Sequence, residues 1–227
     1  MHKLKELQNL VSKRRDPVSG TLETKYTFNY KKLGDFHNGV YDFDDHVVPY
    51  SKSAFNLNAK IMIILQDWAS ENFLSGPINE IQKQLGHDPA LPTNRNLFHL
   101  LNKFLSLEFN EVYATDVFPF VKPGNMGTKI PLADMTLAAD QFAIPQIKII
   151  SPKLVICLGR QTFNSIRQAS GLKPVSLSGS FETNNFLIGK SSIIGVHHVG
   201  GMGTSMIGGK LAQEKQWEKI ASYFKRL

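Results

Sequence analysis

Residues 60–70 read KIMIILQDWAS, an apolar run that ends at an amide and a carboxylate. Its branched aliphatic residues are typical of a β-strand that is covered on both faces, as strands in parallel sheets are. Gln66 and Asp67 follow the run without a break. In open parallel sheets, binding sites lie at the carboxyl ends of the strands, so this stretch predicts both a buried strand and the position of a site.

Three further apolar runs have the length and composition of buried strands. They occupy residues 111–117 (EVYATDV), 153–158 (KLVICL) and 192–196 (SIIGV). Segments with helical spacing of their apolar residues lie between or after the strands, at 97–107, 132–150, 159–168 and 211–224. Pro145 should kink or divide the second of these helices. The alternation predicts a three-layer α/β/α fold around a central four-stranded, mainly parallel sheet.

The 227 residues of the chain fit a single domain, with an α/β core over residues 59–227. Residues 1–58 are expected to form an N-terminal extension that packs on this core. An apolar stripe predicts a helix over residues 2–13, which ends near Pro17. Residues 18–58 show no sustained period, so the sequence predicts no regular element there.

The chain is basic, with a formal charge of +7 and a pI near 9.4. An excess of Lys and Arg suits a polyanionic partner such as DNA, although a basic pI is also a common solubility feature. Cys157 is the only cysteine. This excludes an internal disulfide, a zinc site made of cysteines and an iron–sulfur cluster held by one chain. No signal-peptide core or membrane-length apolar run is present, so we expect a cytoplasmic protein.

Residues able to do chemistry follow the predicted strands. Asp67 could orient or activate a water molecule, or it could simply cap the next helix. Asp116 lies at the end of the second strand, and Phe118 just beyond it could stack on a base or belong to the core. His197 and His198 follow the fourth strand, directly before a glycine-rich segment.

The histidine pair favours anion stabilisation over metal binding. An imidazole can donate a hydrogen bond to a developing oxyanion, and glycines let the backbone approach a ligand. Adjacent side chains on a strand point to opposite faces, so His197 and His198 should not bind one metal ion, and we expect no metal site. Nucleophilic catalysis is also disfavoured, because Cys157 lies within an apolar strand and no G-x-S-x-G turn is present.

Four segments, in this order, resemble motifs of the uracil-DNA glycosylase superfamily, and the resemblance covers residues 59–224. Residues 65–70 (LQDWAS) resemble the first active-site motif, and His198 with the segment after it resembles the second. Between them lie two further matches, VYATDV at 112–117 with KPGN at 122–125, and the structural strand PKLVICLG at 152–159.

The resemblance implies a monofunctional DNA glycosylase, which flips a base out of DNA and hydrolyses its N-glycosidic bond without a metal or other cofactor. It implies that Asp67 positions water and stabilises the oxocarbenium-like sugar, and that His198 stabilises negative charge on the departing base. The residues that it places around the base are Gln66, Trp68, Ala69, Asp116 and Phe118.

The resemblance also implies contacts with single- or double-stranded DNA, made by a monomeric protein. Met202 or Met206 would fill the gap that the flipped nucleotide leaves. The other residues expected to contact DNA are His197, Gly200, Gly201 and Lys210 in or beside the second-motif segment, and Lys122 and Asn125 after the second strand.

Three departures from the family pattern bear on which base the protein would recognise. Asp116 stands where the family has an Asn that reads uracil. Either Asp116 is held neutral by burial, or the preferred base presents a donor there, as the exocyclic amine of cytosine or adenine does. Ala69 replaces a Tyr that excludes the thymine methyl group, which predicts a wider pocket. His198 is followed by Val199 and Gly200 instead of Pro and Ser, and His197 is an alternative for the motif histidine. Two other functions compete with this one. The protein could bind nucleic acid without hydrolysing the N-glycosidic bond, or it could hydrolyse small nucleosides or nucleotides.

Overall fold

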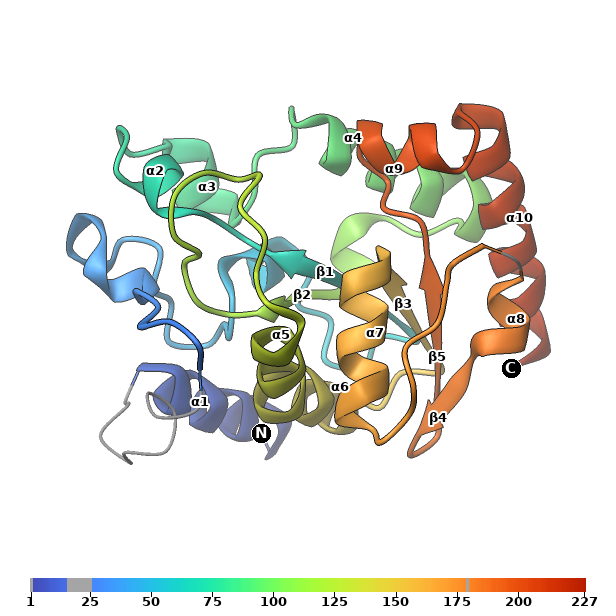
Figure 1. Cartoon of the computed structure of the whole chain (residues 1–227), viewed down its shortest axis with the longest axis horizontal. Helices are drawn as coiled ribbons and strands as arrows, with labels where there is room; N and C mark the ends of the chain where they lie inside the picture. Colours follow the sequence, from blue (N-terminus) through green and yellow to red (C-terminus); the bar gives the residue numbers. More distant parts are fainter. Residues whose placement is uncertain (1, 16–25, 179) are drawn as a thin grey trace.

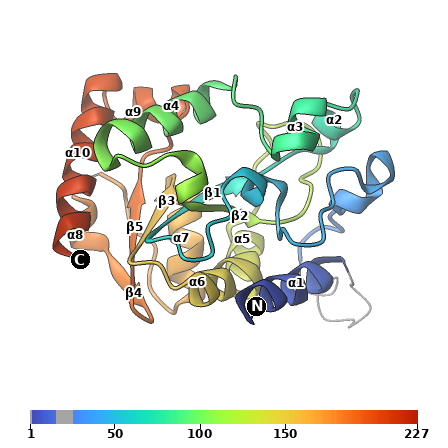
Figure 2. The ribbon, with the colours of Figure 1, turned by 180° about the vertical axis from the view of Figure 1, so that it is seen from behind.

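The structure, a computed structural model, describes residues 2–15, 26–178 and 180–227. Helices cover both faces of a central sheet (Figures 1 and 2). This is the predicted three-layer α/β/α fold. The sheet has the strand order β2-β1-β3-β5-β4. Its strands are β1 (Ile61–Asp67), β2 (Tyr113–Phe118), β3 (Leu154–Leu158), β4 (Phe186–Ile188) and β5 (Ser191–Val196).

The four predicted strands are all present and pair in parallel. They are apolar along most of their length because both of their faces are buried. In the register, Leu65 lies opposite Asp116, and Asp67 lies opposite Phe118. Consequently, the polar residues that follow these strands are brought to a single edge of the sheet.

The prediction of four strands was wrong by one, because β4 adds an antiparallel edge strand. It forms a tight hairpin with β5, in which Gly189 takes a positive φ of 59°. The strand is only three residues long, and Leu187 at its centre is 70% exposed. A strand this short and half-exposed shows no recognisable alternation of apolar and polar residues in the sequence.

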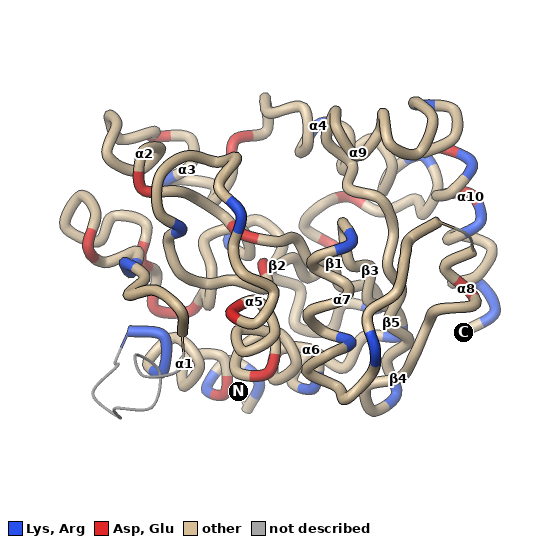
Figure 3. Tube along the Cα trace, in the orientation of Figure 1, with Lys and Arg blue, Asp and Glu red and all other residues tan. Residues whose placement is uncertain are grey.

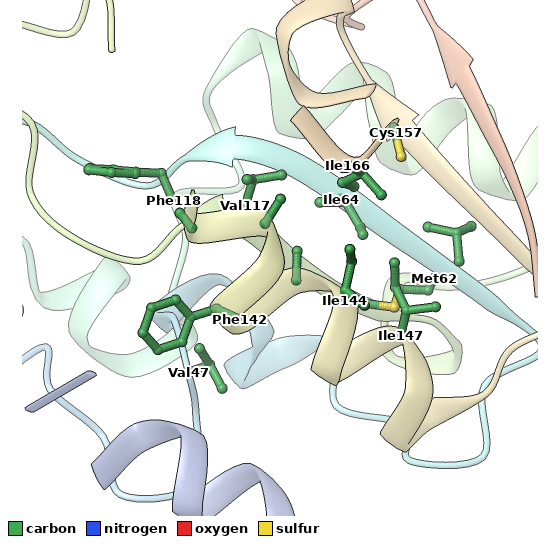
Figure 4. Packing of buried hydrophobic residues seen from close by; sticks show 14 of the residues in the cluster. Val47, Met62, Ile64, Val117, Phe118, Phe142, Ile144, Ile147, Cys157 and Ile166 are labelled. Carbon is green, nitrogen blue, oxygen red and sulfur yellow. The ribbon is translucent and has the colours of Figure 1, made fainter. Parts of the chain in front are cut away.

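The first helical layer packs on the sheet face that carries Met62 and Ile64. Figure 4 shows part of this core, where Phe142 and Ile147 lie beneath β1 and β2. Its helices are α1 (His2–Arg15), α5 (Leu132–Ala138), α6 (Ile144–Ile150) and α7 (Arg160–Ala169). A π-helical turn, η7 (Ala139–Ala143), separates α5 from α6, with Pro145 in the first turn of α6. The predicted division near Pro145 is therefore confirmed.

The second layer packs on the face that carries Ile61, Ile63 and Leu65, with Trp217 fully buried in it. It consists of η4 (Pro49–Ser53), α4 (Pro92–Leu100) with the π-helical turn η5 (Leu101–Leu105), η6 (Phe109–Glu111), α8 (Phe181–Asn184) and α10 (Lys210–Arg226). The short helices α2 (Glu71–Leu74), α3 (Glu80–Leu85) and α9 (Gly201–Met206) lie at the edge where the strands end (Figure 1).

Residues 26–58, for which the sequence predicted nothing regular, contain three 3₁₀ turns, η2 (Leu33–Asp35), η3 (His37–Gly39) and η4. Two isolated β-bridges, of Lys31 with Val121 and of Phe55 with Tyr113, join the segment to β2 and the loop after it. Long-range polar contacts hold the segment to the core. The Tyr30 hydroxyl donates to Asp134 Oδ2 at 2.6 Å, and the backbone N–H of Thr27 donates to Oδ1 of the same carboxylate at 2.9 Å. Such contacts have no sequence period. The predicted end of the first helix near Pro17 lies outside the described residues. Among those that are described, no helix combines the length and apolarity that a membrane crossing requires.

Candidate active site

A cavity of about 460 Å³ opens at the carboxyl ends of the strands. Its wall is built from the ends of β1 and β2, the loop after β2, the segment from α3 to α4, and the start of α9. The lining residues are Tyr50, Leu65, Gln66, Asp67, Trp68, Gln82, His87, Asp88, Leu91, Thr93, Asn94, Asp116, Lys122, Met126, Gly127, His198 and Met202. Three of the residues predicted from strand ends, Asp67, Asp116 and His198, thus share one cavity.

Asp67 is the last residue of β1, and its side chain is only 5% exposed. The Gln66 amide donates to Oδ1 at 2.9 Å, and Lys122 Nζ lies 2.8 Å from Oδ2. Nζ and Oδ2 form an ion pair, but their relative orientation is not that of a hydrogen bond. Ser70, not Asp67, is the N-cap residue of α2. The alternative that Asp67 caps the next helix is therefore wrong, and its charge is held inside the cavity.

Lys122 was predicted to contact DNA, but the structure buries it. Its side chain is 3% exposed, and Nζ also donates to the Met126 carbonyl oxygen at 2.6 Å. A buried carboxylate needs a close countercharge, and Lys122 supplies it to Asp67. Lys122 therefore belongs to the cavity and ties the loop after β2 to it.

The two histidines after β5 point into different hollows. His198 lines the cavity of Asp67, whereas His197 lines a second hollow together with Phe181, Met206 and Lys215. Side chains alternate across a strand, so consecutive histidines at its end are directed to opposite sides. Of the two candidates for the motif histidine, it is His198 that the fold brings to Asp67.

The hydrogen bonding of His198 indicates its tautomer. The backbone N–H of Gly200 donates to His198 Nδ1 at 3.0 Å, so Nδ1 is the acceptor and the neutral ring carries its proton on Nε2. Burial lowers the pKa of His198, an effect that the charge of Asp67 partly opposes. At neutral pH the ring is therefore an uncharged N–H donor.

The glycine-rich segment after His198 folds into helix α9, with Gly200 as its N-cap. Close packing explains the glycines. A Cβ atom on Gly203 would lie 2.0 Å from the His198 carbonyl oxygen, and one on Gly200 would lie 2.8 Å from Thr93 Oγ1. The glycines thus let α9 pack directly on the backbone of His198.

We expect Gly203→Ala to displace α9 from His198 and to lower the activity of the site by about 10²-fold, because small misplacements of catalytic groups have effects of this size. The rate of the reaction proposed below measures this. Ser205→Ala is the control, since Ser205 is an exposed position on the same helix. Equal rates for the two variants would show that the packing of α9 does not position His198.

Asp116 on β2 is 1% exposed, and its Oδ2 atom has no hydrogen-bond partner within the part of the chain that the structure describes. Burial raises the pKa of Asp116 well above its ordinary value, and the charge of Asp67 raises it further. Nearby, the Tyr50 hydroxyl donates to Asn94 Oδ1 at 2.7 Å, and Asn94 Nδ2 donates to the Asp88 carbonyl oxygen at 2.5 Å.

Sequence reasoning missed several polar residues of the wall: Tyr50, Gln82, His87, Asp88, Thr93 and Asn94. Tyr50 lies in the segment without a period, and Asn94 lies within a helix after a proline. Neither position carries a motif. Their place on the wall depends on how the η4 turn and the start of α4 pack at the end of β2.

Two of the predicted base-binding residues do not line the cavity. Ala69 is 1% exposed and packs in a small apolar cluster with Tyr41 and Leu74. Phe118 is fully buried in the core (Figure 4). The centroid of its ring lies 4.7 Å from that of the Tyr30 ring. The prediction that Ala69 widens the cavity is wrong for this reason, and Phe118 belongs to the core. Gln66 and Trp68 do line the wall.

The residues predicted to contact DNA are spread over several parts of the structure. Met202 is 82% exposed beside the Asp67 cavity, whereas Met206 lines the second hollow. Asn125 is exposed in the loop after β2, and Lys210 is exposed at the start of α10. Basic residues are distributed over several elements, including α1 and α10 (Figure 3).

Among residues 2–15, 26–178 and 180–227, no three His, Cys, Asp or Glu side chains gather as metal ligands would. Comparison with protein-family models and with curated proteins found no match for this chain.

Proposed function

We propose that this protein is a DNA glycosylase, which hydrolyses the N-glycosidic bond of a modified or mismatched base flipped out of DNA. The observation that carries the proposal is the meeting of Asp67 and His198 on the wall of one cavity. These residues lie far apart in the sequence, Asp67 at the end of β1 and His198 just after β5. Together they supply a carboxylate and a neutral N–H donor, the two groups that the reaction needs.

The charges that develop in the reaction suit these two groups. As the bond between C1′ and the base nitrogen breaks, its electron pair leaves with the base and the sugar becomes cationic. The Asp67 carboxylate stabilises the cation and accepts a hydrogen bond from the water that attacks C1′, whose proton then passes to solvent. His198 Nε2–H donates to an oxygen of the departing base as it gains negative charge. The base anion takes its proton from solvent.

The size and surroundings of the cavity also support a flipped base. A volume of about 460 Å³ lies within the usual range for small-molecule sites. Met126 and Met202, exposed beside it, are apolar side chains able to enter a base stack. The formal charge of +7 favours a phosphate backbone over a neutral ligand.

The test is a panel of single- and double-stranded oligonucleotides that contain uracil, hypoxanthine, xanthine or mismatched cytosine. After incubation with the protein, alkali cleaves the strand at any abasic site that base release has produced. We expect cleavage of at least one substrate. Salt-dependent binding without cleavage across the panel would instead indicate a nucleic-acid-binding protein. Cleavage of free nucleosides alone, without salt-dependent affinity for DNA, would indicate a nucleoside hydrolase.

A further inference from the structure

We propose that the second hollow, which His197 and Met206 line, binds a nucleotide through its phosphate group. The hollow has a volume of about 460 Å³, within the usual range for small-molecule sites. The ligand is a free nucleotide or a nucleotide unit of DNA, which share the same phosphate and base. The inference does not depend on the proposed reaction, which leaves both His197 and Met206 unused.

The second hollow carries positive charge that its own wall does not neutralise. Lys215 and Lys219 line it, and its described lining residues include no Asp or Glu. Both lysines are exposed on α10, and neither forms an ion pair within residues 2–15, 26–178 and 180–227. Side chains at this spacing are neighbours on one face of a helix, so the two ammonium groups repel each other. A phosphate group bound between them relieves this repulsion.

The Asp67 cavity has the opposite charge pattern. Asp67 and Asp88 both line it, and its lysine, Lys122, is already paired with Asp67. A phosphate group that entered this cavity would meet carboxylates without a free cation to offset them. The charges of the two walls therefore direct a phosphate to the second hollow.

The apolar part of the wall suits the base of a nucleotide. It is formed by Leu177, Phe181, Met206, Ile207 and Ala212. Met206 is 74% exposed, and methionine has a flexible, polarisable side chain that packs well against an aromatic ring. An inorganic anion would leave this surface unused. An apolar wall beside two exposed cations instead fits a ligand that joins a flat ring system to a phosphate group.

His197 contributes an uncharged ring to the same wall. Burial lowers the pKa of His197, so the imidazole is neutral at neutral pH and the two lysines supply the positive charge. Its Nδ1 atom is enclosed by protein and has no hydrogen-bond partner among the described residues. Because Nδ1 does not reach the hollow, we assign to His197 a packing contact with the base and no hydrogen bond from this atom.

Isothermal titration calorimetry with thymidine 5′-monophosphate, thymidine and inorganic phosphate tests the free-nucleotide form of the ligand. We expect the nucleotide to bind about tenfold more tightly than thymidine or phosphate, because it alone contacts both the lysines and the apolar wall. Lys215→Gln/Lys219→Gln should weaken its binding by about tenfold or more. Lys225→Gln is the matched control, because it removes an exposed cation of the same helix that does not line the hollow. This variant should bind like wild type.

A thymidine dodecanucleotide distinguishes the two sources of the nucleotide. If the hollow takes a unit of DNA, the double lysine variant binds the oligonucleotide more weakly. The slope of log K against log salt then falls by about 0.7 to 1.4, the contribution of one or two phosphate contacts on a single strand. If the hollow takes a free nucleotide, only the binding of thymidine 5′-monophosphate depends on the two lysines. The inference is overturned if neither ligand depends on them, or if Lys225→Gln loses as much affinity.

Methyl ¹³C NMR of labelled methionines locates the bound ligand. Met202 and Met206 are both exposed on α9, but they line different hollows. Met202→Leu and Met206→Leu assign the two resonances. Whichever ligand binds should shift the Met206 resonance, and thymidine 5′-monophosphate should leave that of Met202 in place. An unchanged Met206 resonance at saturation overturns the inference even in an active glycosylase, and a shifted one supports it even if no oligonucleotide is cleaved.

Discussion

Asp67→Asn is expected to lower the rate of base release by about 10²–10⁴-fold, the usual range for loss of a positioned catalytic carboxylate. The amide keeps the size of the side chain but removes the negative charge that, in the proposed reaction, stabilises the cationic sugar. Affinity for DNA that contains an abasic site should change little, because the residues proposed to contact DNA do not include the buried carboxylate. Single-turnover rates on the best substrate of the panel, together with binding titrations, measure both quantities.

Asp88→Asn is the matched control, because it makes the same chemical change on the wall of the same cavity. The Asp88 carboxylate accepts from the Ala90 backbone N–H, a role that an Asn side chain can keep. Its rate should change by less than about tenfold. Circular dichroism must show that Asp67→Asn is folded, since the variant deprives Lys122 of its countercharge. A folded Asp67→Asn protein with full activity would rule out the mechanism.

The sheet could be predicted from the sequence because its central strands are buried on both faces and therefore continuously apolar. Residues 60–65 show this most clearly, and β1 begins and ends close to the predicted positions. The edge strand β4 escaped prediction because half of it faces solvent over only three residues. Residues 26–58 also escaped, since polar contacts such as that of Tyr30 with Asp134 hold them in place.

The sequence predicted only those residues of the candidate site that lie at the ends of strands. Asp67 and Asp116 lie near the carboxyl ends of β1 and β2, and His198 follows β5, so parallel pairing brings them together. The partner of Asp67 could not be foreseen, because the sequence does not show that the loop after β2 turns inward. In the sequence, Lys122 is indistinguishable from a surface cation. In the structure, its Nζ atom lies 2.8 Å from Asp67 Oδ2.

Lys122→Met should lower the free energy of unfolding by about 3–5 kcal/mol, the usual effect of removing one partner from a buried ion pair. Methionine keeps much of the apolar stem of lysine, but Asp67 loses its countercharge and the Met126 carbonyl loses a donor. Urea unfolding followed by circular dichroism measures the loss. Lys129→Met is the control, because Lys129 is an exposed cation near the same loop. It should change the free energy by no more than about 0.5 kcal/mol.

A double-mutant cycle tests whether the loss comes from the ion pair itself. Removal of Lys122 leaves a buried anion, and removal of the Asp67 charge leaves a buried cation. In the double variant Asp67→Asn/Lys122→Met neither charge remains, so it should be less destabilised than the sum of the single variants. If the two losses simply add, the pair is not coupled, and Lys122 then stabilises the loop after β2 through Met126 alone. Coupling would instead mean that the charge needed for base release is maintained by a lysine enclosed in the same cavity.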